Sequence, residues 1–171
     1  DDVKIRKKYL NRASKGVERL TYIIKDLDMI TKLEVGDLSL NKEKFDILEL
    51  VQNVFDLFEM KAKKRNITLT FDRIYDFPHF VKGDIERIEQ VLINLIVNSI
   101  KYGKVGGVTR VSIESYNPNK FIIKITDDGE GIKEEHISRL FERFYRVDQS
   151  RSREQGGSGL GLSIVKHIME A

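Results

Sequence analysis

Residues 91–102 read VLINLIVNSIKY, an apolar run interrupted by Asn94, Asn98 and Lys101. The polar residues follow one another at spacings of four and three, which places them along one stripe of an α-helix. Burying a polar side chain without a partner costs roughly 1–3 kcal/mol, so three on one stripe need a common partner. The pattern indicates an anion with its metal ion. The alternative is that the asparagines hydrogen-bond to backbone inside the core.

Two glycine-containing segments supply what such a partner needs. Residues 127–132 read DDGEGI and follow the apolar run 121–125. A buried carboxylate is therefore expected at a strand end, just before glycines that let a ligand approach the backbone. Residues 156–162 read GGSGLGL and open the helix-like segment 163–169. The free N–H groups at such a helix start attract phosphate.

The composition fits one domain, or one compact domain with an appended element. The chain has 171 residues, of which 40% are hydrophobic, and no apolar run approaches the roughly 18 residues of a membrane span. Thirty basic and 27 acidic residues give a net charge of +3, which does not indicate a nucleic-acid partner. The absence of cysteine excludes disulfides and thiolate metal sites.

The first 38 residues are predicted to form one long amphipathic helix. Their apolar positions are spaced by three and four, as in Leu10, Ala13, Val17, Leu20, Ile24 and Leu27. About thirty residues give a helix of about 45 Å, longer than a small domain needs, so we expect a helical partner in a dimer. The alternative is that the helix packs on its own domain. Its periodicity stops near Gly36, which predicts a globular part at 39–171.

The remaining segments predict a two-layer α+β sandwich, with a sheet on one side and helices on the other. Helical spacing recurs at 47–64, and Asp84 can cap the helix that carries the asparagines. Val111 and Ile113 alternate with polar residues, so they should point inward from a strand. Strands are predicted at 42–46, 67–71, 108–116 and 121–126, the last two joined as a hairpin by a turn at 117–120.

Together with FERFYR at 141–146, these segments resemble the nucleotide-binding domain of sensor histidine kinases. In order and spacing, the N box resembles 90–102, the first glycine box 127–131 and the second glycine box 157–162. The resemblance implies a Bergerat-type ATP-binding fold over 39–171. It also implies that residues 1–38 are the second helix of the dimerisation and phosphoacceptor hairpin. The family continues into further strands, so the sheet is expected to be truncated at its C-terminal end.

The resemblance assigns roles to residues of the N box and the first glycine box. Asn98 would reach Mg²⁺, a metal that suits oxygen ligands, and Asn94 would support phosphate or metal one turn earlier. Lys101 would contact phosphate and Tyr102 would cover the adenine. Asp127 would accept the exocyclic amine of adenine, and the alternative is a turn-capping aspartate. The implied ATP-binding set is completed by Gly129, Gly131, Ile132, Gly157, Gly159, Leu160, Gly161 and Leu162.

The F box and the stretch after it are predicted to form the lid of the site. Phe141, Phe144 and Tyr145 are spaced by three and four, so they are expected to pack from a short helix. Arg146 resembles the lid arginine that offsets the charge of the transferred phosphate, with Arg143 as a second. The polar stretch that follows, through residue 155, has the composition of a mobile lid. Asn94 and Arg146 are the two candidate catalytic residues.

None of the three histidines matches the acceptor pattern H-[ED]-x-x-x-P of the family. His79, His136 and His167 are therefore expected to be structural or solvated. The implied function is transfer of the γ-phosphoryl of Mg-ATP to a histidine outside this sequence, for relay to an aspartate of a response-regulator receiver domain. The implied context is the cytoplasmic part of a bacterial sensor, a homodimer through its N-terminal helix, with any membrane anchor in segments outside the sequence.

Two other functions remain open at this point. One is a catalytically silent module that binds adenine nucleotide or only dimerises. The other is an ATPase of the same fold, but related ATPases carry a glutamate at the position of Asn94 to activate water. An asparagine cannot accept that proton, which favours phosphoryl transfer over hydrolysis.

Overall fold

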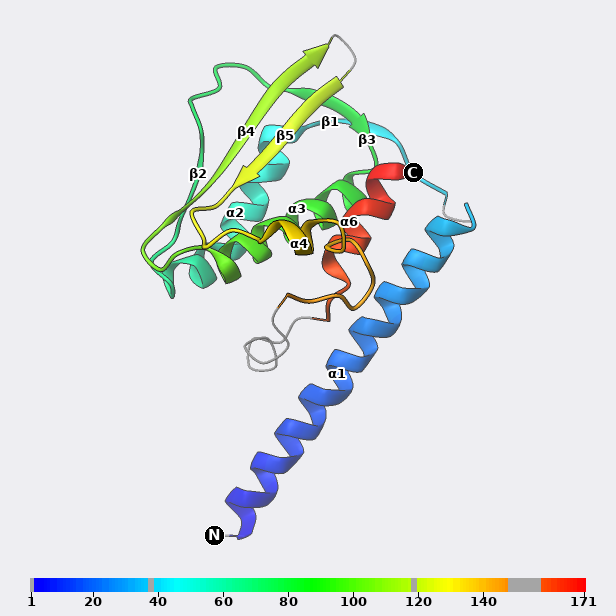
Figure 1. Cartoon of the computed structure of the whole chain (residues 1–171), viewed down its shortest axis with the longest axis vertical. Helices are drawn as coiled ribbons and strands as arrows, with labels where there is room; N and C mark the ends of the chain where they lie inside the picture. Colours follow the sequence, from blue (N-terminus) through cyan, green and yellow to red (C-terminus); the bar gives the residue numbers. More distant parts are fainter. Residues whose placement is uncertain (1, 37–38, 118–119, 148–157) are drawn as a thin grey trace.

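The structure is a computed structural model that describes residues 2–36, 39–117, 120–147 and 158–171. It is a mixed α and β fold with a long first helix, which confirms the predicted fold class (Figure 1). The helices are α1 (Asp2–Glu34), α2 (Ile47–Lys63), α3 (Ile85–Tyr102), α4 (Glu134–Ile137) and α6 (Gly161–Glu170). The strands are β1 (Glu43–Asp46), β2 (Thr68–Phe71), β3 (Phe80–Gly83), β4 (Val108–Asn117) and β5 (Lys120–Thr126).

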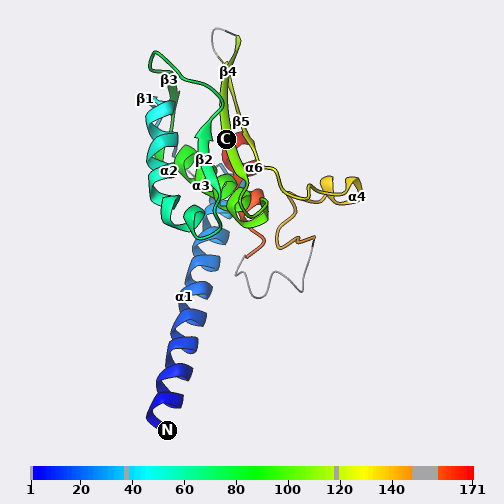
Figure 2. The same ribbon diagram turned by 90° about the vertical axis from the view of Figure 1, so that its left-hand side faces the viewer.

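The strands form one layer, divided into two sheets. β1 pairs antiparallel with β3, whereas β2 pairs parallel with β4 and β4 antiparallel with β5. The β4–β5 register runs from Arg110 opposite Thr126 to Asn117 opposite Lys120, so the predicted hairpin is confirmed. The two residues at its tip, 118–119, lie outside the described part of the chain. Helices α2 and α3 pack against the strands, and α6 packs on α3 and on the end of α1 (Figures 1 and 2).

The main core lies between α2, α3 and the inner face of β4 and β5. Val111 and Ile113 are fully buried, as their alternation with polar residues predicts. They meet the apolar face of α3, which is formed by Leu92, Ile96 and Ile100. Because the apolar face of α3 is turned to the sheet, its polar stripe is left to point elsewhere.

Helix α1 is exposed over most of its length and docks only through its last turns. Leu10, Val17 and Ile24 are 64–65% exposed, whereas Met29 and Ile30 are buried in a second cluster with α3 and α6. The helix therefore projects from the globular part in both views (Figures 1 and 2). Its end packs on the domain, as the alternative interpretation expects, and its exposed face leaves room for a helical partner. No helix within the described ranges is long and apolar enough to cross a membrane.

The end of α1 is also joined to the globular part by charged groups. The Glu34 carboxylate accepts a hydrogen bond from the Arg143 guanidinium and lies 3.5 Å from Nε2 of His167. The hydrogen bond from Arg143 lowers the pKa of the Glu34 carboxyl from its ordinary value of 4.5, and the charges of Arg143 and His167 act in the same direction. One carboxylate thus links α1, the segment after α4 and helix α6.

We expect this link to be lost at acidic pH. A lowered pKa means that the contact is intact above pH 4.5 and disappears as the pH falls through the lowered value. NMR signals of the Arg143 guanidinium should shift over that range in the native chain and stay unchanged in Glu34→Gln. Asp28→Asn, which removes a 2.8 Å ion pair to Lys32 within α1, is the control and should titrate like the native chain. An identical titration in Glu34→Gln would contradict the assignment.

Candidate nucleotide-binding site

The polar stripe of α3 is positioned by the start of the helix and by its apolar face. Asp84 is the N-cap, and its carboxylate accepts a hydrogen bond from the backbone N–H of Arg87 at 3.1 Å, as predicted. With Ile96 buried against the sheet, Asn94 and Asn98 lie on other faces of the helix and are half-buried. The local sequence thus fixes both the start of the helix and the direction of its carboxamides.

One atom of the half-buried Asn94 side chain, its Nδ2, is buried and has no hydrogen-bond partner within the described ranges. No hydrogen bond ties the Asn98 side chain to any residue that the structure describes. An unpaired buried amide costs roughly 1–3 kcal/mol, which is the situation expected of a group that waits for a ligand. The alternative interpretation, in which the asparagines bond to backbone in the core, does not hold for these residues.

The second glycine box meets α3 at Asn94. A Cβ added to Gly161 would lie 3.2 Å from Oδ1 of Asn94, so little space separates the helices there. Gly161 is the first residue of α6, and no side chain caps this helix start. The first N–H groups of a helix have no intrahelical partner, so they remain available to an anion. The N box and the second glycine box therefore converge, as the sequence motifs predict.

The first glycine box meets the other end of α3. A Cβ on Gly129 would lie 2.5 Å from the backbone oxygen of Tyr102, so only glycine fits at this approach. Gly131 has a φ of +74° and faces open space. Ile132 is half exposed. The loop at 127–132 thus lies beside the helix end that carries Tyr102.

Asp127 is exposed, so the expectation of a buried carboxylate at the strand end was wrong. Strand β5 ends at Thr126, and Asp127 is already beyond the covered part of the sheet. Its Oδ1 accepts a hydrogen bond from the backbone N–H of Gly129 at 2.9 Å. The turn-capping alternative is therefore realised by one oxygen, while the exposed carboxylate retains acceptor capacity for a ligand.

Lys101 and Tyr102 close the polar stripe at the end of α3. The Lys101 ammonium lies 4.9 Å from the centre of the Tyr102 ring, a cation–π arrangement. The Tyr102 ring is 57% exposed, so one of its faces can cover a base. Both side chains lie at the end of α3 that the Gly129 loop approaches. An ammonium group, an aromatic ring and the loop that carries Asp127 are therefore neighbours.

The segment before α6 is held against the F box. Gly159 has a φ of +78°, and a Cβ there would lie 2.9 Å from the backbone of Phe144. The backbone N–H of Phe144 donates to the oxygen of Gly159 at 3.0 Å. Leu160 is fully buried among α1, α3 and α6, so its side chain serves packing and only its backbone can face a ligand. Leu162 is half-buried, and Gly157 lies outside the described residues together with the rest of 148–157.

The F box does not form the short helix that its spacing predicts. The helix in this region is α4, and residues 138–147 are turns and irregular backbone. Phe144 has a φ of +63°, which no helix allows, and is 53% exposed. Only Tyr145 packs as expected, with its hydroxyl 2.8 Å from Nδ1 of His136 and the Arg139 guanidinium 4.3 Å from its ring centre.

The F box does form a concave, basic surface. A hollow of about 280 Å³ is lined by Arg139, Glu142, Arg143, Phe144, Tyr145 and Arg146. The guanidinium of Arg139 is paired with Glu142 at 2.9 Å, and that of Arg143 is paired with Glu34. Arg146 is half-buried in the same hollow, next to the segment that leads to the second glycine box.

Known proteins are similar to this chain in sequence and in fold. The profile of a family described as "Histidine kinase-, DNA gyrase B-, and HSP90-like ATPase" matches residues 83–171, from the start of α3 to the end of α6. The chain belongs to this family. The match contains the N box and both glycine boxes, so it confirms the resemblance that these motifs indicate.

Individual members of the family are similar over most of the chain. Sensor histidine kinase WalK of Bacillus subtilis is 33% identical over 96% of this chain and 27% of its own length. A structure of the Acinetobacter baumannii histidine kinase AdeS matches 90% of this chain and 68% of its own, with a TM-score of 0.73 and 34% identity. The catalytic domain of histidine kinase ThkA matches 76% of this chain and 80% of its own, with a TM-score of 0.65 and 32% identity. The chain spans about a quarter of WalK.

Asp128, to which the sequence assigns no role, has a structural role beside the first glycine box. Its carboxylate accepts hydrogen bonds from the backbone N–H groups of Val108 at 3.0 Å and Lys104 at 3.4 Å. It thereby joins the first glycine box to the loop after α3. No local pattern indicates this contact, because Asp128 lies beyond β5 and its partners are 20 and 24 residues away in the sequence.

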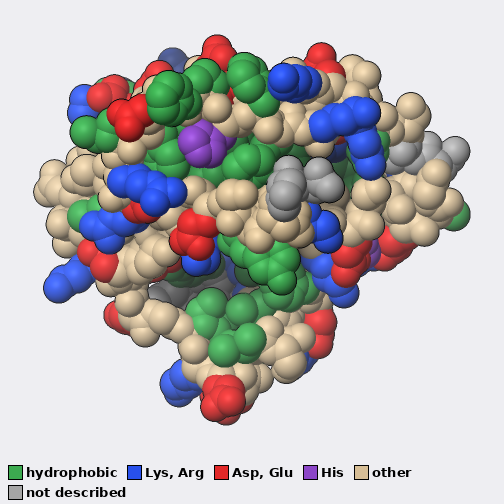
Figure 3. All heavy atoms as spheres, turned by 90° about the horizontal axis from the view of Figure 1, so that it is seen from above, with side chains coloured by type: hydrophobic (Ala, Val, Ile, Leu, Met, Phe, Trp, Pro, Cys, Tyr) green, Lys and Arg blue, Asp and Glu red, His purple; other side chains and the backbone are tan. Residues whose placement is uncertain are grey.

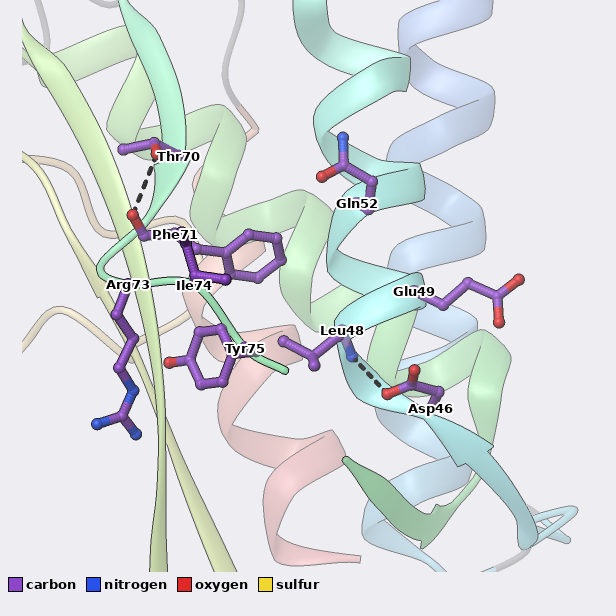
Figure 4. Close-up of a pocket in the computed structure, with 9 residues that line it drawn as sticks. All are labelled: Asp46, Leu48, Glu49, Gln52, Thr70, Phe71, Arg73, Ile74 and Tyr75. Atoms are coloured by element: carbon purple, nitrogen blue, oxygen red, sulfur yellow. Dashed lines mark hydrogen bonds between the residues drawn. The ribbon is translucent and has the colours of Figure 1, made fainter. Parts of the chain in front are cut away.

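A larger hollow of about 640 Å³ lies elsewhere, between α2 and the segment after β2 (Figure 4). It is lined by Asp46, Leu48, Glu49, Gln52, Thr70, Phe71, Arg73, Ile74 and Tyr75. None of these residues belongs to the family motifs, and Asp46 is engaged as the N-cap of α2, accepting from Leu48 N–H at 3.1 Å. From above, charges of both signs are interspersed with apolar side chains (Figure 3). Neither this hollow nor this surface contributes a residue to the candidate nucleotide site.

The residues of the site fit a magnesium nucleotide better than a protein-bound metal. No group of three or more His, Asp or Glu side chains in the described ranges could hold a metal ion. Mg²⁺ commonly takes only one or two protein ligands and completes its shell with phosphate and water oxygens. The carbonyl oxygen of a carboxamide such as Asn98 suits that arrangement.

Proposed function

We propose that this chain is the ATP-binding catalytic part of a sensor histidine kinase. The observation that carries the proposal is the buried, unpartnered amide nitrogen of Asn94, at the point where α3 meets the glycine start of α6. A ligand with several acceptor oxygens would satisfy both this amide and the free N–H groups of α6. Adenosine triphosphate has such oxygens, and the loop at 127–132 offers a place for its base.

In the proposed complex, different side chains bind the base, the phosphates and the metal of the nucleotide. Asp127 accepts the exocyclic amine of adenine, and Tyr102 covers the base. Lys101 binds phosphate, while Asn98 and the phosphates hold Mg²⁺, with Asn94 supporting them. When bound, Mg²⁺ neutralises charge on the phosphate oxygens. The backbone from Gly157 to Leu162 wraps the phosphates.

The proposed reaction is phosphoryl transfer rather than hydrolysis. Arg146 offsets the charge that develops on the transferred phosphoryl group, a task suited to the planar guanidinium. Asn94 cannot take a proton from water, so the site lacks the base that an ATPase needs. The γ-phosphoryl group passes to a histidine outside this chain. Release of inorganic phosphate from ATP by the chain alone would favour the ATPase.

In the whole protein, we propose that α1 forms the second helix of a dimerisation hairpin. Its exposed apolar face, with Leu10, Val17 and Leu20 at 60–64% exposure, supports a helical partner. The proposed downstream partner is a response-regulator receiver domain. Histidine kinase ThkA has been solved in complex with response regulator protein TrrA, and that ThkA chain is 29% identical to this one. The proposed place of the chain is the cytoplasmic part of a bacterial sensor.

Titration of Mg-ATP onto the chain by calorimetry tests the nucleotide proposal. We expect one site per chain, occupied more weakly by Mg-GTP and not by inorganic phosphate alone. Absence of heat with Mg-ATP, under conditions where circular dichroism shows a folded chain, would refute the proposal.

Asp127→Asn should relax the preference for adenine over guanine. A carboxylate only accepts hydrogen bonds, whereas an amide can also donate to the oxygen that guanine carries at that position. We expect the ratio of ATP to GTP affinity to fall roughly tenfold. Glu130→Gln removes one negative charge from the same exposed loop and is the matched control. An unchanged ratio in Asp127→Asn, or an equal fall in Glu130→Gln, would count against base recognition by Asp127.

A further inference from the structure

An arginine from outside the family motifs is hydrogen-bonded to the end of α3. Arg65 lies in the turn between α2 and β2 and is half-buried. Its guanidinium donates to the backbone oxygens of Ile100 at 2.5 Å, of Lys101, and of Gly103 at 3.2 Å. One side chain therefore binds two carbonyl groups in the last turn of α3 and the carbonyl group of its C-cap, Gly103.

The carbonyl groups of Ile100 and Lys101 are among those that a helix leaves without partners. The last four oxygens of an α-helix have no intrahelical donor, and the helix dipole places partial negative charge there. The planar fork of a guanidinium satisfies several oxygens and supplies a fixed positive charge. The ammonium of Lys101, on the same turn of the helix, lies over the Tyr102 ring.

The loop after α3, residues 103–107, is held by Arg65 and by Asp128. The backbone oxygen of Arg65 accepts from the N–H of Gly106 at 3.1 Å. The Asp128 carboxylate accepts hydrogen bonds from the backbone N–H groups of Lys104 and Val108. A Cβ on Gly107 would collide with that carboxylate at 2.2 Å. The helix end and the first glycine box thus form one braced unit.

We propose that Arg65 is a positioning residue for the adenine side of the cleft. It is not one of the side chains proposed to contact the nucleotide and acts through the end of α3, whose Tyr102 oxygen lies against Gly129. By holding that end, Arg65 sets where Lys101 and Tyr102 stand relative to the base-binding loop. This inference rests on the proposed nucleotide-binding function.

The test compares Arg65→Met, Arg65→Lys and the native chain by calorimetry, at a temperature where each is folded. Arg65→Met should weaken ATP binding roughly tenfold, because it removes several charge-assisted hydrogen bonds behind the site. The loss should be the same with and without Mg²⁺, since the metal lies at the phosphate end. Arg65→Lys keeps the charge but not the fork, so it should recover part of the affinity. Hydrogen exchange at amides 103–107 should be faster in Arg65→Met.

A matched control separates positioning from general destabilisation. Ile113→Val trims a buried side chain of β4 and lowers stability without removing any of the hydrogen bonds that Arg65 makes. It should leave the affinity for ATP unchanged. Native-like binding by Arg65→Met, or an equal loss in Ile113→Val at comparable melting temperature, would overturn the role of Arg65 alone. Failure of the native chain to bind ATP would overturn the proposed function and this inference with it.

Discussion

Asn98→Ala is expected to lower the affinity for Mg-ATP on the order of 100-fold, because it removes the only protein oxygen proposed to reach the metal. The Asn98 side chain is half-buried on the polar stripe of α3 and has no hydrogen-bond partner among the described residues. Its removal therefore breaks no side-chain hydrogen bond within the described part of the chain. Binding of ATP without metal should change little, since the base and the phosphates keep their other contacts.

Calorimetry in Mg²⁺ and in a chelator measures the two affinities separately. The control is Asn53→Ala, which removes an exposed carboxamide from α2 and should alter neither value. A loss of equal size with and without Mg²⁺ would contradict the role of Asn98 as a metal ligand. A loss in Asn53→Ala would show that the effect is not specific to the stripe.

The elements predicted with most success are those whose signals are local. The cap of α3 at Asp84, the apolar period of that helix and the alternation around Val111 and Ile113 all follow from neighbouring residues, and the structure agrees with each. The convergence of the boxes was predicted from the order of motifs rather than from physics alone. It needed the resemblance, because no local pattern says that Asn94 lies beside Gly161.

The predictions that were wrong or missing concern residues whose conformation depends on contacts with distant parts of the sequence. The spacing of Phe141, Phe144 and Tyr145 suits a helix, but Phe144 adopts a positive φ while its backbone bonds to that of Gly159. The exposure of Asp127 depends on where β5 ends. The bond between Glu34 and Arg143 joins residues far apart in the sequence, so no period could indicate it.

Part of the candidate site remains a prediction. Gly157 and most of the predicted lid fall in 148–157, outside the described residues. The ligand roles of Asn98, Lys101 and Asp127 are likewise predictions, because geometry places these side chains without showing what they bind. The division of the chain at residue 38 also stays a prediction, although α1 ends at Glu34 and β1 begins at Glu43.

The chain alone is expected to place no phosphate on its own histidines, and a separate acceptor hairpin should restore labelling. Each imidazole is already engaged. His79 has Nδ1 2.9 Å from the oxygen of Phe77, and its ring packs on Tyr75. Nδ1 of His136 is 2.8 Å from the Tyr145 hydroxyl, and Nε2 of His167 is 3.5 Å from Glu34.

These contacts involve one ring nitrogen of each imidazole, and the other nitrogen can still carry a lone pair. The expectation therefore rests on the acceptor pattern H-[ED]-x-x-x-P, which none of the three histidines matches. The measurement incubates the chain with γ-labelled Mg-ATP, with and without a histidine-bearing hairpin from a related kinase, and follows acid-labile phosphate. The Asn98→Ala variant should not label the added hairpin, which ties the transfer to the proposed site. Label on His79, His136 or His167 without the hairpin would overturn the assignment of the acceptor to another segment. Binding of Mg-ATP without transfer to any hairpin would instead favour a silent nucleotide-binding module, because the same cleft would then hold ATP without presenting its terminal phosphoryl group.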